Sequence, residues 1–123
     1  LKIRVSEKKQ ISQSIFSIYN KFKSVDDIDT INIIRKTLGD KLAETRETGS
    51  IALDLCNVGC GKYDGSIFAN PYQNHILISE LISKETGGMI NLIEDKESKI
   101  YISSNKYVGK ILKEIIENYD EKK

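Results

Sequence analysis

His75 is the only histidine in the chain, and its imidazole is the natural general base for hydrolysis near neutral pH. Small ribonucleases that need no metal can work with one histidine assisted by lysine, tyrosine, arginine or glutamate. Lys62, Tyr63, Arg46 and Glu80 supply these types. If the chain is an enzyme, we therefore expect His75, Tyr63 and Lys62 to be its catalytic residues. The alternative is a histidine at a helix start that moves no proton.

Cys56 and Cys60 form a Cys-x3-Cys pair. Two thiolates are half of a tetrahedral zinc site, which needs three or four protein ligands. His75 is distant in sequence, so Asp54 or Asp64 would have to complete the set. We expect reduced cysteines, no metal and no cofactor, and a loop disulfide or redox pair remains the alternative. So few cysteines favour a reducing, cytoplasmic compartment.

The segment from Leu53 to Lys62 combines an apolar run with the triplet Gly59-Cys60-Gly61. It resembles the glycine-rich first motif of class I S-adenosylmethionine-dependent methyltransferases, in which a strand runs into a glycine turn beside the cofactor. Cys56, Asn57 and Val58 stand between the run and the glycines, and a second β run follows instead of a helix. The resemblance implies a cofactor-binding turn as a third possibility.

Two helices are expected in the N-terminal half. Residues 7–23 have apolar side chains three and four apart, with Ser6 as the predicted N-cap. A second helix begins at Asp26 or Asp27 and ends near residues 48–49. Its predicted apolar face consists of Ile28, Ile31, Ile34, Leu38 and Leu42.

The period then changes to that of strands. Residues 50–56 alternate apolar and other side chains, which predicts a half-buried strand, and the three glycines in 57–65 predict a loop. Residues 66–69 are expected to form the returning strand. Residues 72–86 should form a helix that stops at Gly87 and Gly88. A hairpin is expected from residues 89–94 and 99–103.

The last helix, capped by Ser104, has an unusually wide apolar stripe. We expect one row of it to face the sheet, namely Tyr107, Ile111, Ile115 and Tyr119. The second row lies about 100° further round the helix. This row is the candidate binding surface for a partner and consists of Val108, Leu112 and Ile116.

Composition limits the function classes. The 123 residues are 39% hydrophobic and 30% charged, which predicts one folded domain spanning residues 1–123. The charges of nineteen basic and eighteen acidic residues nearly cancel, so nucleic acid is not the expected partner. Residues 1–50 hold ten basic and seven acidic side chains, however, so contact with nucleic acid through this half stays an alternative. No apolar run is long enough to span a membrane.

These expectations give an α+β fold with an antiparallel sheet of about four strands and the element order ααββαββα. From the second helix onward, this order resembles that of roadblock/longin-type adaptor domains. We therefore expect a small non-catalytic protein-binding domain, such as an adaptor, regulator or immunity-type inhibitor, with a protein partner or a second copy as its ligand. Nothing in the sequence requires catalysis. The alternative is a metal-independent nuclease or toxin-type domain with His75 as general base.

Overall fold

The computed structural model describes residues 3–19, 25–94 and 98–121. Its elements in chain order are a short 3-10 helix (Ile11–Gln13), β1 (Ile15–Ile18), α1 (Val25–Leu38), β2 (Glu44–Arg46), α2 (Ile51–Gly59), β3 (Gly65–Ala69), α3 (Gln73–Thr86), β4 (Met89–Glu94), β5 (Lys99–Ser104) and α4 (Val108–Glu121). Within these ranges no helix is both long and apolar enough to cross a membrane.

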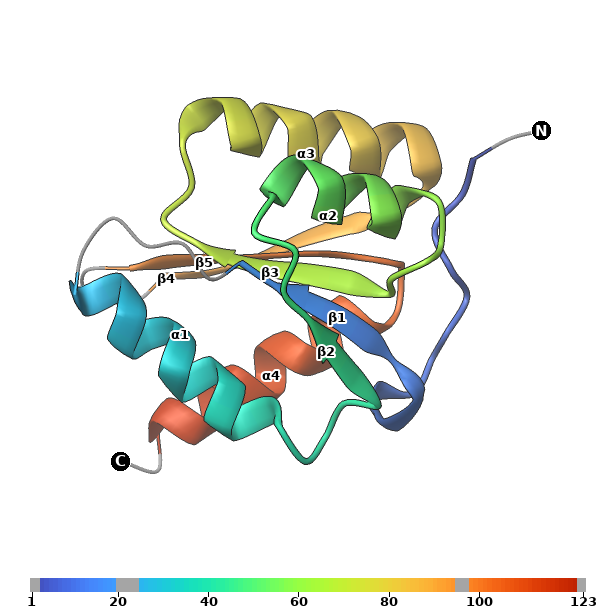
Figure 1. Ribbon diagram of the computed structural model, residues 1–123. Coiled ribbons are helices and arrows are strands. Elements are labelled where there is room, and N and C mark those ends of the chain that lie inside the picture. The colour runs from blue at the N-terminus through green and yellow to red at the C-terminus, as the bar shows by residue number, and fades with distance from the viewer. Residues whose placement is uncertain (1–2, 20–24, 95–97, 122–123) are drawn as a thin grey trace.

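The five strands form one mixed sheet in the order β2-β1-β3-β5-β4. β1 is parallel to both β2 and β3, whereas β5 is antiparallel to β3 and β4. Helices α2 and α3 cover one face of the sheet, and α1 and α4 cover the other (Figure 1). The α+β class is confirmed. The expected antiparallel sheet of about four strands is wrong, because β1 and β2 were not recognised and both run parallel to a neighbour.

The expected helix over residues 7–23 is replaced by an irregular segment, a single 3-10 turn and β1, while residues 20–23 lie outside the described part. β1 places Phe16 and Ile18 in the core on one face of the sheet and Ser17 on the other. Ile11, Ile15 and Ile18 have the spacing of a helix face, whereas Phe16 and Ile18, two apart, have that of a strand face. The interleaved Phe16, fully buried but absent from the predicted stripe, distinguishes the two.

The expected strand over residues 50–56 is helix α2. Its buried apolar residues, Ile51, Leu55 and Val58, are four and three apart, whereas Leu53 is half-exposed. Ser50 begins the helix, since its Oγ accepts the Leu53 N–H at 3.2 Å. The glycine turn therefore follows a helix rather than a strand, which removes the basis of the methyltransferase resemblance.

Three other predicted elements are confirmed with small shifts at their ends, namely strand β3, helix α3 and the β4–β5 hairpin. The second predicted helix is confirmed only in its first part, because α1 ends at Leu38 and the predicted continuation to residues 48–49 contains strand β2. α3 stops at Gly87, whose φ of 81° is a conformation that glycine adopts without strain. The hairpin turn expected at residues 95–98 lies mostly outside the described residues.

Helix α4 buries the row that was expected to bind a partner, while the row expected to face the sheet is exposed at its start and has Ile115 partly buried against the core. Val108, Leu112 and Ile116 are 0–3% exposed in the core against the sheet and α1, so this row is not a free partner surface. Tyr107 and Ile111 are 40% and 38% exposed. The cap also differs, because the Asn105 side chain rather than Ser104 accepts the first free N–H groups. The capping residue is thus Asn105, one position after the predicted Ser104, and α4 begins at Val108.

Candidate functional site at the carboxyl edge of the sheet

Three helices begin at one edge of the sheet. Because β1, β2 and β3 run in the same direction, their carboxyl ends lie at the same edge, and α1, α2 and α3 follow them there (Figure 1). We call this edge, with Tyr19 and residues 47–50 and 70–75, the carboxyl edge. In open sheets with parallel strands, ligands bind outside the carboxyl ends of the strands. The topology therefore makes the carboxyl edge the candidate site.

The start of α2 is held by Thr48. Its hydroxyl donates to Asp54 Oδ1 at 2.6 Å and accepts the Ser50 N–H at 3.1 Å. Gly49 between them has a φ of 78°, which lets the chain turn from β2 into the helix. These bonds fix the first turn of α2, where helical N–H groups lack intrahelical partners and carry partial positive charge.

Asp54 lies in the first turn of α2 and is fully buried. Burial raises the pKa of this carboxyl, and hydrogen bonding to the Thr48 and Ser17 hydroxyls opposes the rise. Its Oδ2 and the hydroxyls of Ser17 and Ser66 lack a partner that meets full hydrogen-bond geometry among the described residues. Ser17 and Ser66 are paired neighbours in β1 and β3. A layer of small polar groups thus lies between α2 and the sheet, next to the carboxyl edge.

The start of α3 carries His75. Asn70, with a φ of 46°, ends β3, and its side-chain oxygen accepts the Lys99 N–H at 2.8 Å. His75 then lies in the first turn of α3, partly buried, with its ring centroid 5.9 Å from that of Tyr72. Its Nδ1 is buried and has no hydrogen-bond partner in the described part of the chain. A titratable side chain therefore stands where a ligand at the carboxyl edge would bind.

Lys62 and Tyr63 lie at the opposite edge. Their N–H groups donate to the Asn57 carbonyl at 2.9 and 3.1 Å in the turn that precedes β3. The five residues of β3 separate this turn from α3, a span of about 16 Å at about 3.3 Å per residue. The predicted catalytic trio is therefore not brought together, and only His75 is at the carboxyl edge.

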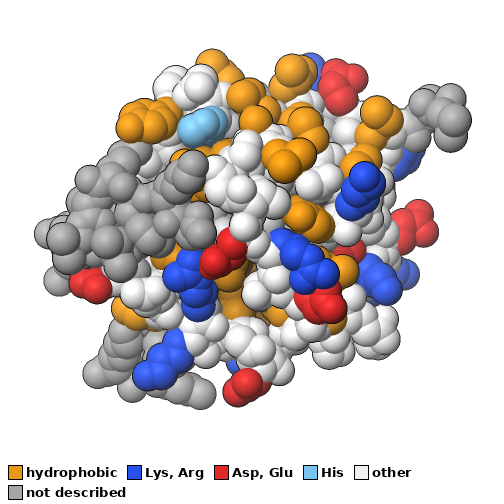
Figure 2. Space-filling view, in the orientation of Figure 1, with side chains coloured by type: hydrophobic (Ala, Val, Ile, Leu, Met, Phe, Trp, Pro, Cys, Tyr) orange, Lys and Arg blue, Asp and Glu red, His pale blue; other side chains and the backbone are white. Residues whose placement is uncertain are grey.

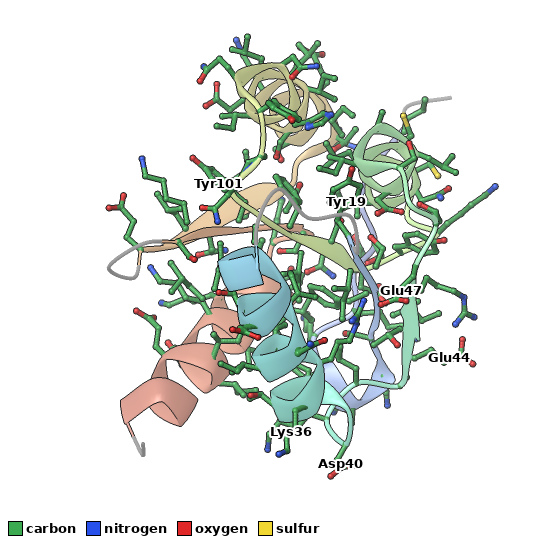
Figure 3. The ribbon with its side chains drawn as sticks, turned by 60° about the vertical axis from the view of Figure 1, so that its left-hand side comes forward. Tyr19, Lys36, Asp40, Glu44, Glu47 and Tyr101 are labelled. Atoms are coloured by element: carbon green, nitrogen blue, oxygen red, sulfur yellow. The ribbon has the colours of Figure 1, made fainter. Side chains whose placement is uncertain are left out.

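The two tyrosines beside this region are structural. Tyr19 and Tyr101 pack with Ile78 and Ile82 against the cluster of Ile51, Leu55 and Phe68, and Figure 3 shows both tyrosines beneath the α2–α3 layer. On the outer side of that layer, apolar side chains are exposed among polar and charged ones (Figure 2). The large apolar ones are Leu53, Tyr72, Leu77 and Leu81.

Among the described residues, no group of three or more His, Cys, Asp and Glu side chains is arranged to hold a metal ion. The group formed by Thr48, Asp54, Ser17 and Ser66 was not predicted from the sequence. Its one signal was Asp54, an acid inside the apolar run of 51–55.

The chain resembles two curated proteins called Nus factor SuhB. It is 28% identical over 119 residues to that of Pasteurella multocida, covering 94% of this chain and 44% of that protein. It is 30% identical over 90 residues to that of Haemophilus influenzae, covering 73% of this chain and 34% of that protein. No family model matches the sequence.

The fold is that of half of an inositol monophosphatase. The structure of inositol monophosphatase from Anabaena (Nostoc) sp. PCC 7120 superposes with a TM-score of 0.78 and 20% identity, covering 94% of this chain and 48% of that one. The chain also spans less than half the length of the curated relatives it matches.

These likenesses overturn the expected function. The named proteins are SuhB proteins and a monophosphatase, which is a catalyst, and not adaptors, regulators or immunity-type inhibitors. The alternative of a nuclease or toxin-type domain meets the same contradiction. The similarity to roadblock/longin domains in element order fails as well, because the sheet contains parallel strands that the predicted order did not include.

Proposed function

We propose that this chain forms part of a phosphatase that hydrolyses phosphate monoesters of a polyol, and that it binds the phosphate group at the carboxyl edge. The observation that carries the proposal is the monophosphatase fold, shared over 94% of the chain with a TM-score of 0.78. The chain spans less than half the length of its curated relatives. The proposal therefore includes catalytic residues that correspond to the part of those relatives that this chain does not cover.

The carboxyl edge suits a phosphate monoester. The first turns of α2 and α3 both begin there, and free N–H groups at helix N-termini favour phosphate oxygens. The Thr48–Asp54 hydrogen bond holds the first turn of α2 in place for this contact. His75, in the first turn of α3, supplies a group that binds phosphate when protonated or gives a proton to the departing alkoxide.

Binding tests the location of the site directly. We expect inositol 1-phosphate, added to the isotopically labelled 123-residue chain, to shift the backbone amide resonances of residues 50–53 and 73–76. Inositol without phosphate is the control and should leave them unchanged. Shifts confined to the opposite edge, around residues 61–64, would contradict the proposal, as would no shift at millimolar ligand.

Phosphate release tests the activity. We expect the phosphatase that contains this chain to release phosphate from inositol 1-phosphate but not from a phosphodiester or RNA. His75→Ala should lower the rate of release by about 100-fold, a typical contribution of a general acid or base. Lys62→Ala is the matched control at the opposite edge and should leave the rate unchanged. A normal rate in His75→Ala combined with a loss in Lys62→Ala would refute the assignment of the carboxyl edge.

The expected protein partner or second copy stays a prediction, as does the cytoplasmic location. The exposed Leu53, Leu77 and Leu81 on α2 and α3 favour such a partner, since large exposed apolar side chains are commonly covered at interfaces. The SuhB relatives are Nus factors by name, so they give no support to the expectation that nucleic acid is not a partner of this chain.

A further inference from the structure

Cys56 and Cys60 stand one helical turn apart at the end of α2, at the opposite end of the helix from the carboxyl edge. The Cys60 N–H donates to the Cys56 carbonyl at 3.1 Å, which fixes this spacing. Both thiols are free and both residues are exposed. Side chains four apart on a helix have Cβ atoms about 5–6 Å from each other. One ion with two metal–sulfur bonds of roughly 2.3 Å can bridge such a pair.

The two cysteines line one cavity. It has a volume of about 800 Å³ and lies between the N-terminal segment, α2 and α3, where Ile3, Arg4, Ile82 and Glu85 complete its wall. Cys60 Sγ donates to the Asn57 carbonyl at 3.6 Å, a contact that the thiol gives up when it releases its proton and binds a metal ion. The sulfurs are therefore accessible from a space that is partly shielded by apolar side chains.

From this arrangement we propose that Cys56 and Cys60 form a two-coordinate site for a soft monovalent metal ion of the copper(I) class. Zinc is excluded as the fitting ion because no third ligand completes a set among the described residues. Soft thiolates select copper(I), which two sulfurs satisfy in a linear arrangement. Binding releases one proton from each thiol.

The charge of the cavity fits such a complex. Two thiolates around one monovalent ion carry a net charge of −1. The Arg4 side chain lines the same cavity and forms no ion pair with a described residue, so its guanidinium is available to offset that charge. Glu85 lies in the same wall and is not part of a three-ligand group.

Anaerobic titration with copper(I), delivered from a coloured chelator that competes for it, tests the site. We expect one copper per chain, with a thiolate-to-copper absorption band in the ultraviolet. Cys56→Ser and Cys60→Ser should each weaken copper binding by more than about 100-fold. Removing a residue that only hydrogen-bonds a metal ligand already costs up to about 100-fold in affinity, and here the ligand itself is removed. Circular dichroism of both variants checks that α2 remains folded.

Two control variants make the result specific. Met89→Leu removes the only methionine, an exposed sulfur outside the cavity, and should leave the affinity unchanged. Glu85→Gln should also leave it within about twofold, whereas a large loss would mean a three-ligand site and overturn the proposal. Copper bound equally well by Cys60→Ser, or one copper shared by two chains, would overturn it too. Failure of this site leaves the phosphatase proposal untouched, because the two use opposite ends of α2.

Discussion

Asn105 is predicted to be the most sensitive single polar residue of the fold. It is fully buried, and its side-chain oxygen accepts the N–H groups of Tyr107 and Val108 at 2.9 and 3.0 Å. Its amide nitrogen donates to Lys8 O at 2.8 Å and to Ser6 Oγ at 3.0 Å. One side chain therefore caps α4 and also ties the N-terminal segment to the β5–α4 connection.

Replacing Asn105 with Ala removes all four of these hydrogen bonds. Loss of an N-cap costs about 1 kcal/mol, and leaving a buried acceptor such as Lys8 O without its donor costs about 1–3 kcal/mol. We expect the free energy of unfolding to fall by about 2–4 kcal/mol. For a domain of this size, that corresponds to a drop in Tm of roughly 10 °C. The loss is a large fraction of the roughly 5–15 kcal/mol that holds a domain folded.

Urea denaturation and thermal melts followed by circular dichroism measure the effect. Ser104→Ala is the matched control at the neighbouring position, where the hydroxyl donates only to the Asn105 carbonyl at 2.8 Å. Its expected cost is about 1 kcal/mol, that of one hydrogen bond. Asn105→Ser should fall between the two, because serine caps the helix but cannot reach Lys8. A larger cost for Ser104→Ala than for Asn105→Ala would refute the assignment of the cap.

Two further predictions concern a buried acid and the two rows of α4. Because burial raises the pKa of Asp54 in the folded state, the wild-type free energy of unfolding should fall as pH rises from about 3.8, the ordinary value, through the raised pKa. Asp54→Asn should lack this component and be at least as stable at neutral pH, as pH-dependent urea melts will measure. Leu112→Ala should cost roughly 2–5 kcal/mol in the same assay, and Ile111→Ala about 0.5 kcal/mol. Equal costs in this pair would contradict the observed assignment of the rows.

The elements that the sequence predicted correctly are those whose boundaries carry their own chemistry. Helix α3 ends at two consecutive glycines, and the β4–β5 hairpin surrounds a polar turn. Helix α1 was predicted from its apolar face, on which Ile31 and Ile34 are fully buried, but its end at Leu38 was not predicted. In each case the local signal and the tertiary packing agree, so no knowledge of the neighbours was needed.

The elements that were predicted wrongly are short apolar runs with two valid periods. In residues 51–58, alternation fits Ile51, Leu53 and Leu55, while helical spacing fits Ile51, Leu55 and Val58. Burial decides for the second set, because α2 covers the sheet on one side only and leaves Leu53 exposed. The same ambiguity, with the opposite outcome, produced a helix where β1 is found. Single-sequence periodicity cannot separate such cases, since the deciding contacts come from strands far away in the chain.

Strand direction explains why the candidate site could not be assembled from residue types alone. His75, Tyr63 and Lys62 are close in sequence, and an antiparallel reading of β3 with its predecessor gave no reason to separate them. The parallel pairing of β1, β2 and β3 sends the carboxyl end of every one of these strands to the same edge. It follows that chemistry at this edge must come from residues just after each strand, such as Thr48 and His75. Residues just before a strand, such as Lys62 and Tyr63, belong to the other edge, where the end of α2 offers two thiols instead.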